Sequence, residues 1–259
     1  MPPLTVTEAV AQRKSCRAFL SRAPPIGEIR ELLALASRAP SGANMQPWRA
    51  YVVSGAARDG LVARIQALLD AGAPRAILRN DSMRNPVTRS SEPGEAPADS
   101  DEFAVYPTRE ALAQKRDMRD RRRKLGLDMY RLLGITKGDT DGILAALKRN
   151  YSFFDAPVGI IITVDKAGDR NFFGHVGSFL QTFCLLACER DLATCLQEAW
   201  SQFDEPVADE LGIDRDREAI WCGIAVGYED PSKPVNRLVT DRAPVEDFAT
   251  FFDAPRARL

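Results

Sequence analysis

The sequence predicts an α+β fold in which helices pack on a mixed sheet. Residues 158–165 and 220–227 are apolar runs of strand length that are rich in β-branched residues, as is typical of buried strands. Residues 172–190 predict a helix with apolar side chains on most of its faces. A helix that is apolar all round must be buried, so we expect it in the centre of the domain if the protein is a monomer, or else in the core of a dimer.

Two shorter helices are predicted at the N-terminal end. Thr5 and Glu8 match a capping box, which places a helix over residues 6–12. The next helix is amphipathic and should end near Ser37, because Pro40 resists continuation. Its apolar residues are spaced by three and four: Ile26, Ile29, Leu33 and Ala36.

Residues 80–135 are expected to form a variable excursion from the domain. Between residues 80 and 107 the composition shifts to Ser, Pro, Gly and acidic residues, over a length too great for a routine connection. Residues 109–133 then predict a basic helix. Asp117 and Asp120 interrupt its positive charges and no base-reading motif accompanies it, so a solvated helix face is favoured over nucleic-acid binding.

The C-terminal region, residues 228–259, predicts a turn-rich stretch, an extended segment over residues 235–239 and a final helix. That helix would carry Phe248, Phe251 and Phe252. So much apolar surface in a tail must dock against something.

Length alone allows one domain or two, and we expect one soluble, cytoplasmic domain over residues 1–259 because candidate ligand-binding motifs lie towards both ends of the chain. The net charge of -1 argues against nucleic acid and anionic membranes as partners. No signal peptide precedes the first helix, and the apolar runs are too short to cross a bilayer.

Five cysteines are an odd number and favour reduced thiols, and no metal site is expected. The only histidine, His175, is interpreted as a hydrogen-bonded core or interface residue.

Two short segments carry polar groups suited to ligand binding. Arg13 and Arg17 flank Ser15 after the first predicted helix, and arginine presents a planar fork of donors that grips a phosphate. The alternative is a solvated basic helix end.

The second segment covers residues 38–48 and places small or amide side chains on a backbone loosened by Gly42. Ser41, Asn44 and Gln46 offer donors and acceptors to the edge of a heteroaromatic ring. The alternative is a tight polar turn that leads into a strand over residues 49–54.

Together, the motifs Arg13-Lys-Ser-Cys-Arg-Ala-Phe19 and Ala39-Pro-Ser-Gly-Ala-Asn-Met-Gln-Pro-Trp48 resemble the signature of the nitroreductase family of flavin mononucleotide (FMN) enzymes. The resemblance continues at residues 150–157, 180–181, 192–198 and 234–244. It implies a three-layer α+β fold whose central, mostly antiparallel sheet is surrounded by helices, built as an interwoven homodimer.

The resemblance also implies roles for individual residues. Arg13 and Arg242 would hold the FMN phosphate, while Lys14, Ser15 and Arg17 would reach the ribityl chain and the pyrimidine edge. The C-terminal arm would wrap the partner subunit and deliver Arg242. The loop contributed by the partner subunit would supply Pro40, Ser41, Asn44 and Gln46.

The stretch of residues 195–198 would run beside the flavin. It would contribute Cys195, Leu196, Gln197 and Glu198, with the backbone amide of Gln197 or Glu198 pointing at N5. Family members often carry proline or a second glycine in this stretch, whereas this chain has Leu196 and Ala199. By analogy, residues 80–135 would form a lid over the substrate, and Phe103, Tyr106 and Phe154 are candidate substrate contacts. For Phe103 and Tyr106 the alternative is ordinary packing.

The implied activity is an FMN-dependent oxidoreductase that takes hydride from NADH or NADPH and reduces small nitroaromatic compounds by a ping-pong mechanism. A cation such as Arg17 would stabilise the anionic reduced flavin. No side chain need act as a nucleophile. The alternatives are quinone or enone reduction, reductive dehalogenation, or a non-catalytic flavin-binding protein that retains FMN without oxidising nicotinamide.

Overall fold

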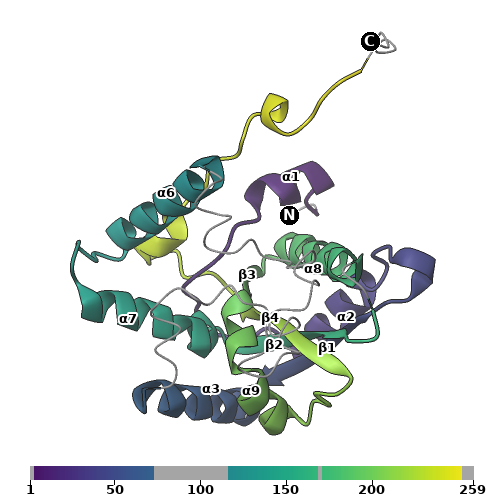
Figure 1. Cartoon of the computed structure of the whole chain (residues 1–259), viewed down its shortest axis with the longest axis horizontal. Coiled ribbons are helices and arrows are strands. Elements are labelled where there is room, and N and C mark those ends of the chain that lie inside the picture. Colours follow the sequence, from purple (N-terminus) through teal and green to yellow (C-terminus); the bar gives the residue numbers. More distant parts are fainter. Residues whose placement is uncertain (1–2, 73–115, 169–170, 253–259) are drawn as a thin grey trace, which may run out of the picture.

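The computed structural model describes residues 3–72, 116–168 and 171–252. Its centre is a four-stranded sheet with the strand order β1-β2-β4-β3 (Figure 1). Every neighbouring pair of strands is antiparallel, and an isolated parallel bridge joins Ser15 to Thr194 beside β3. The predicted α+β fold with a mostly antiparallel sheet is confirmed. The strands are β1 (Trp48–Ser54), β2 (Val158–Asp165), β3 (Ala193–Gln197) and β4 (Glu218–Gly227).

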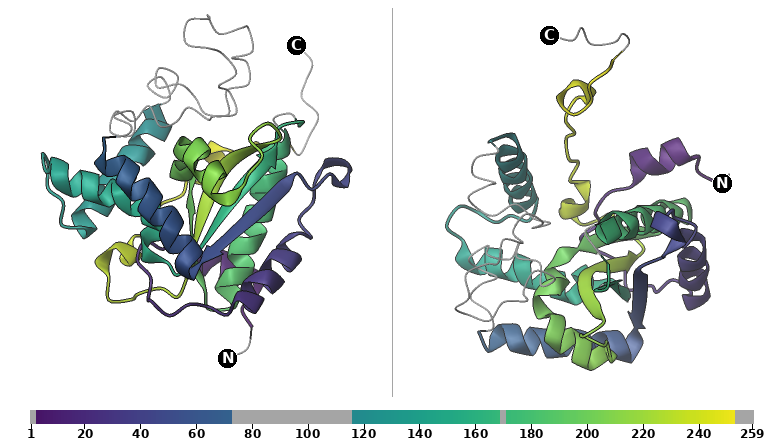
Figure 2. Two further views of the ribbon diagram at one scale, coloured as in Figure 1. Left: turned by 90° about the horizontal axis from the view of Figure 1, so that it is seen from below. Right: turned by 45° about the vertical axis from the view of Figure 1, so that its right-hand side comes forward.

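Helices cover both faces of the sheet and produce three layers (Figures 1 and 2). One face packs on α8 (Asn171–Glu189) and α2 (Ile26–Ala36), and α1 (Val6–Gln12) lies against α8. The other face packs on α3 (Gly55–Asp70) and α9 (Asp204–Leu211).

The central strand β2 is buried on both faces, which explains its uninterrupted apolar sequence. Ile160 and Ile162 belong to the core cluster on the α8 side, whereas Ile161 belongs to the cluster on the α3 side. This division follows from the alternation of side chains along a strand.

The N-terminal helices form where the sequence predicts them. Thr5 Oγ1 accepts from the Glu8 backbone N–H at 3.3 Å, and Glu8 Oε2 accepts from the Thr5 N–H at 2.7 Å, which completes the capping box. The helix α2 ends at Ala36 with Ser37 as its cap. The expectation that Ile26 lies on the buried face is wrong. Ile26 is exposed because the stripe that meets the core is Ile29, Leu32 and Ala36.

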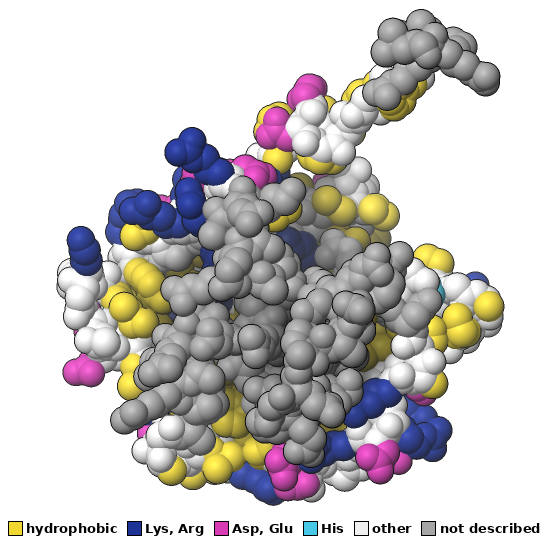
Figure 3. All heavy atoms as spheres, in the orientation of Figure 1, with side chains coloured by type: hydrophobic (Ala, Val, Ile, Leu, Met, Phe, Trp, Pro, Cys, Tyr) yellow, Lys and Arg dark blue, Asp and Glu magenta, His cyan; other side chains and the backbone are white. Residues whose placement is uncertain are grey.

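The basic helix α6 (Arg116–Leu132) stands on the outside of the molecule and has no fully buried residue (Figure 1). Lys and Arg side chains gather over it on the face shown in Figure 3. Its charges pair along the helix, as between Lys124 and Asp128 at 3.0 Å, which matches the predicted solvated face. The helix α7 (Thr140–Lys148) follows and leads into the 3-10 segment η4 (Arg149–Asp155). No helix in the described ranges is long and apolar enough to cross a bilayer.

The C-terminal region departs from two predictions. Instead of an extended segment, Pro234–Arg237 form the 3-10 helix η6, because the Asn236 side chain accepts from the Arg17 N–H and donates to the Ala18 and Asp230 carbonyls. The predicted final helix is also wrong, since between η6 and residue 252 the chain forms only the short 3-10 helix η7 (Val245–Asp247). The arm leaves the body of the chain (Figure 1), its phenylalanines at 248, 251 and 252 are exposed among the described residues, and a short isolated helix is marginally stable in water.

Candidate active site

The segment that contains Arg13, Ser15 and Arg17 lies along the edge of the sheet. Ser15 forms the parallel bridge with Thr194 of β3, and the Cys16 N–H donates to the Thr194 carbonyl at 3.0 Å. The pairing therefore sets two arginines and a hydroxyl beside β3.

Cys195 lies beneath this segment. Burial raises the pKa of its thiol to about 11, although Arg17, the Ser15 hydroxyl and Arg13 each act in the opposite direction. The electrostatic influence of both arginines on one thiol indicates that their positive charges converge on this part of β3.

The end of β3 is tied to η4 by Gln197. This side chain is buried, and its Nε2 donates to the Asn150 carbonyl at 2.6 Å. Its Oε1 is buried and has no partner among the described residues. Because successive side chains of a strand point to opposite faces, Leu196 is exposed while its neighbour Gln197 is buried. The next residue, Glu198, is exposed and starts the 3-10 segment η5 (Glu198–Phe203).

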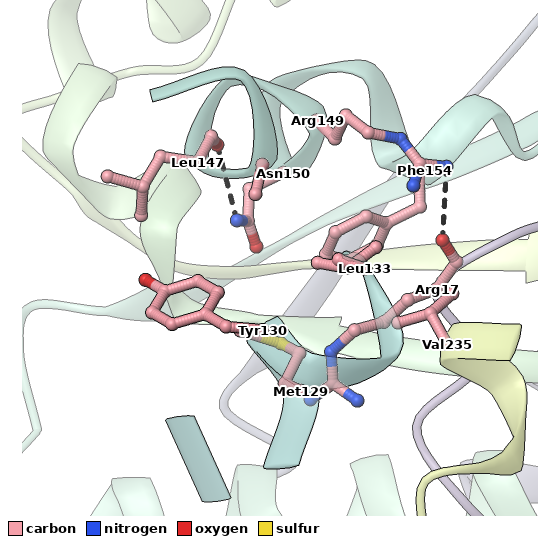
Figure 4. Close-up of a pocket in the computed structure, with 10 residues that line it drawn as sticks. Arg17, Met129, Tyr130, Leu133, Leu147, Arg149, Asn150, Phe154 and Val235 are labelled. Carbon is pink, nitrogen blue, oxygen red and sulfur yellow. Dashed lines mark hydrogen bonds between the residues drawn. The ribbon is translucent and has the colours of Figure 1, made fainter. Parts of the chain in front are cut away.

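A pocket opens where Arg17 meets α6, α7, η4 and η6 (Figure 4). It is a hollow of about 380 Å³ that includes space open to solvent. Most of its wall is apolar, and its polar residues are two arginines, one asparagine and one tyrosine. The lining residues are Arg17, Met129, Tyr130, Leu133, Ala146, Leu147, Arg149, Asn150, Phe154 and Val235.

The pocket wall formed by η4 has an unusual backbone that an aromatic stack holds in place. Phe153 stacks on Trp200 of η5 with ring centroids 4.2 Å apart. Gly159 and Gly223 make room for this pair, because a Cβ at either position would lie within 2.5 Å of one of the rings. Packing of this kind supports three consecutive non-glycine residues with φ between 52° and 68°: Phe153, Phe154 and Asp155.

The loop before β1, which includes η1 (Gly42–Asn44), is organised by its own polar side chains. Ser41 Oγ accepts from the Gln46 N–H at 3.0 Å, and Gln46 Nε2 donates to the Asn44 carbonyl at 3.2 Å. His175 Nε2 of α8 accepts from the Gly42 N–H at 3.1 Å, which fits the predicted hydrogen-bonded histidine. Figures 1 and 2 show this connection between α2 and β1 on the opposite side of the chain from α6 and α7.

Both the sequence and the fold are similar to those of known proteins. The model of the family described as "Nitroreductase family" matches residues 10–228. The chain belongs to the nitroreductase family. It is 32% identical to the 4-nitrobenzoate reductase of Nocardioides sp. (strain LMS-CY), over 97% of this chain and 92% of that protein.

Solved nitroreductase structures agree with this membership. The FMN- and NADPH-dependent nitroreductase NfnB from Sphigopyxis sp. strain HMH superposes with a TM-score of 0.80 at 29% identity, covering 97% of this chain and all of that one. The FMN-dependent nitroreductase NfnB from Mycobacterium smegmatis in complex with NADPH superposes with a TM-score of 0.73 at 25% identity. The match covers 96% of this chain and 100% of that chain.

In this nitroreductase-family chain, the structure gathers only some of the predicted site residues. Ser15, Arg17, Cys195 and Gln197 lie along or beside β3, and Phe154 lines the neighbouring pocket. The connection between α2 and β1, whose sequence includes Pro40, Ser41, Asn44 and Gln46, lies on the opposite side of the same chain from α6 and α7 (Figures 1 and 2).

Two predicted cofactor-binding side chains have partners within the chain. Lys14 Nζ donates to Glu229 Oε1 and to the Asn236 carbonyl, both at 2.8 Å. Arg242 donates to Thr240 and to the Asp241 carbonyl within the C-terminal arm. The candidate substrate contacts Phe103 and Tyr106 lie outside the described residues.

Sequence reasoning assigned no role to Arg149, although it directly precedes the 150–157 motif. Its guanidinium donates to the Arg17 carbonyl at 3.1 Å and lines the pocket. Met129 of α6 and Leu133, which directly follows this helix, were also missed, because apolar residues at such positions carry no signal that separates a pocket wall from ordinary packing.

Proposed function

We propose that this protein is an FMN-dependent NAD(P)H nitroreductase that acts as a homodimer on small nitroaromatic compounds. The observation that carries the proposal is the pairing of residues 13–17 with β3, which brings two arginines and a hydroxyl to a strand that ends beside an apolar pocket. Relatives named as nitrobenzoate, nitrobenzene and chloronitrobenzene reductases support the substrate class.

The residues beside β3 fit FMN by their chemistry. Arg13, Ser15 and Arg17 combine positive charge with a hydroxyl, as a ligand with a phosphate, a polyol chain and a polar ring edge requires. The unpartnered, buried Oε1 of Gln197 lies in the strand whose end is expected to face the flavin ring. A buried acceptor of this kind calls for a donor, which a bound ligand would supply.

The homodimer is supported by the placement of the two motif loops. The 40–46 loop and the pocket lie on opposite sides of one chain, so that chain does not combine them in one site. A second copy would bring its own loop, with exposed Asn44 and Gln46, to the β3 side of the first. The cytoplasmic location expected from the sequence stays a prediction.

When bound, FMN would accept hydride from NADH or NADPH and reduce the nitro group, for which the first two-electron balance is R–NO₂ + NAD(P)H + H⁺ → R–NO + NAD(P)⁺ + H₂O. Arg13 and Arg242 would bind the phosphate, and Arg17 would stabilise negative charge at the pyrimidine edge. The backbone amide of Gln197 or Glu198 would donate to the ring. The apolar wall of the pocket would hold the acceptor ring and exclude water.

An anaerobic spectral titration with NADH and with NADPH, followed by a nitroarene, tests the proposal. Bleaching of a flavin absorption band and its return with stoichiometric loss of the nitro compound is the expected result. Bleaching that only a quinone, an enone or a halogenated phenol reverses would assign another acceptor. Retained FMN without nicotinamide oxidation would indicate a non-catalytic flavin protein.

A further inference from the structure

The pocket contains more positive charge than the proposed hydride transfer requires. Arg17 and Arg149 both line it, and its other lining residues are uncharged. Arg17 is the cation expected at the pyrimidine edge of the flavin. Arg149 is therefore a second cation in a wall that is otherwise mostly apolar (Figure 4).

Arg149 is fixed in position before any ligand binds. Its Nη2 donates to the Arg17 carbonyl at 3.1 Å and to Asp155 Oδ2 at 3.3 Å. Its guanidinium lies over the Phe154 ring, with Cζ 5.9 Å from the ring centroid (Figure 4). Both hydrogen bonds to the described residues use Nη2, so Nε and Nη1 keep their donors for a ligand. A guanidinium held in this way loses little freedom when it binds an anion.

The charge of Arg149 is not cancelled by Asp155. The Asp155 side chain is 65% exposed, so water screens this ion pair. A ligand anion inside the pocket would meet Arg149 between apolar walls, where the effective dielectric constant is lower and the attraction stronger. The pocket therefore favours an anionic group on an otherwise apolar ligand.

We propose that this pocket binds an acidic nitroarene and that Arg149 is the partner of its carboxylate group. The inference rests on the proposed function and narrows its substrate class. Met129, Leu133 and Phe154 provide apolar surface for the ring. The Gln197–Asn150 hydrogen bond connects this wall to the end of β3, where the flavin is expected.

Binding of unreactive acids tests the carboxylate site without turnover. Isothermal titration of the FMN-loaded protein with benzoate and with benzamide, a neutral analogue of similar shape, should show benzoate binding about tenfold more tightly or better. Arg149→Met should abolish this preference, and Arg149→Lys should restore part of it because the charge is retained. Equal affinity for benzoate and benzamide in the wild-type protein would overturn the proposal.

Arg58→Met is a matched control. Arg58 Nη2 donates to the Ser152 carbonyl at 2.7 Å, so this arginine also braces η4 but does not line the pocket. The benzoate preference should survive in Arg58→Met. If it disappears there as well, Arg149→Met acts through the shape of η4 and the carboxylate assignment is wrong.

Turnover separates the carboxylate site from the proposed function. The ratio of kcat/KM for 4-nitrobenzoate to that for 4-nitrobenzamide should fall about tenfold in Arg149→Met. Benzoate binding without reduction of either nitro compound would contradict the proposed function and leave the carboxylate site standing. A rise in KM for NADPH relative to NADH, with the acid-to-amide ratio unchanged, would show that Arg149 serves the coenzyme phosphate and would overturn the inference.

Discussion

Arg13 is one of the two arginines proposed to bind the FMN phosphate. It follows α1 beside β3, and its charge acts on the thiols of Cys184 and Cys195. A charge-assisted hydrogen bond contributes about 1.5–3 kcal/mol, so Arg13→Ala should weaken FMN binding by about ten- to a hundredfold. The flavin-to-protein absorbance ratio after gel filtration measures this loss. Arg22→Ala is the control, because Arg22 is exposed and packs over the Tyr228 ring at 3.6 Å. Full flavin occupancy in Arg13→Ala would refute the phosphate assignment.

His175 is expected to act on FMN through the loop it holds. Its Nε2 accepts from the Gly42 N–H, next to three non-glycine residues with positive φ: Ala43, Asn44 and Gln46. Such a loop needs support from its surroundings. His175→Leu removes the acceptor and should raise the Kd for FMN about fivefold, equivalent to about 1 kcal/mol. His175→Gln keeps an acceptor oxygen and should leave FMN binding and turnover largely intact. Equal losses in both variants, measured by flavin fluorescence titration, would show that the hydrogen bond is not responsible.

Cys195 is expected to make the folded protein less stable as the pH rises from about 9 to about 11. In the unfolded chain its thiol ionises near the ordinary pKa of 9.0, whereas burial raises the pKa to about 11 in the folded protein. Folding thus favours the protonated thiol, so its contribution is full below pH 9 and is lost as the pH rises to 11. We expect up to about 1.4 kcal/mol of lost stability per pH unit from this group. Urea unfolding of the FMN-free protein at pH 8 and pH 10 should show a smaller decrease in Cys195→Ala. Identical decreases in the two proteins would contradict the prediction.

At the scale of elements, the Phe153–Trp200 stack fastens the two 3-10 segments that flank the site. Gly223 of β4 allows the approach, because a Cβ there would lie 2.3 Å from Trp200 Cδ1. Gly223→Ala should therefore destabilise the protein by about 1–3 kcal/mol through overpacking, and should also weaken FMN binding because η5 begins at Glu198. Thermal unfolding and flavin titration measure the two effects. Gly60→Ala is the control, since its Cβ would meet no atom closer than 3.7 Å and lies within α3, where alanine is favoured. A neutral Gly223→Ala would refute this role for the stack.

The elements that sequence reasoning located correctly are those with a local physical signal. Thr5 and Glu8 specify the start of α1, and the doubly buried β2 has the bounds its apolar run predicts. The left-handed residues of η4 could not be predicted, because Phe153 and Phe154 have no intrinsic preference for positive φ and obtain it from packing against distant strands. The motif at residues 150–157 therefore indicated where η4 lies in the sequence but not the conformation of its backbone.

The candidate site was predicted in a similar, partial way. The arginines of residues 13–17 predict a phosphate site, with a solvated basic helix end as the alternative, and the phosphate assignment stays a prediction. The pocket was not predicted, since α6, α7, η4 and η6 come from three separate parts of the chain. The second positive charge of the pocket is held in place by the hydrogen bond from Arg149 to the Arg17 carbonyl. This bond joins residues 132 positions apart in the sequence.

At the scale of the whole molecule, the apolar side chains of the C-terminal arm do not pack into the core that the described residues form. Phe248 and Phe251 are 74% and 78% exposed, and Val239 is exposed as well. The arm starts at η6, which is anchored to the N-terminal segment through Asn236. Its base is therefore fixed while its apolar end projects outward (Figure 1). Such a patch is typical of a protein interface, and a second copy of this chain is the expected occupant.

The double substitution Phe248→Ser and Phe251→Ser tests this arrangement. It should raise the dimer dissociation constant about tenfold or more, because two aromatic side chains lose their buried contacts. FMN binding should fall in parallel, since the 40–46 loop and Arg242 are expected to reach the flavin only across the dimer. Light scattering after size exclusion and flavin titration on the same samples measure both. Met118→Ser, at an exposed position of α6, is the control and should change neither. A fully dimeric double variant would refute docking of the arm. A monomer that still binds FMN with unchanged affinity would refute the shared site and place the whole flavin site within one chain.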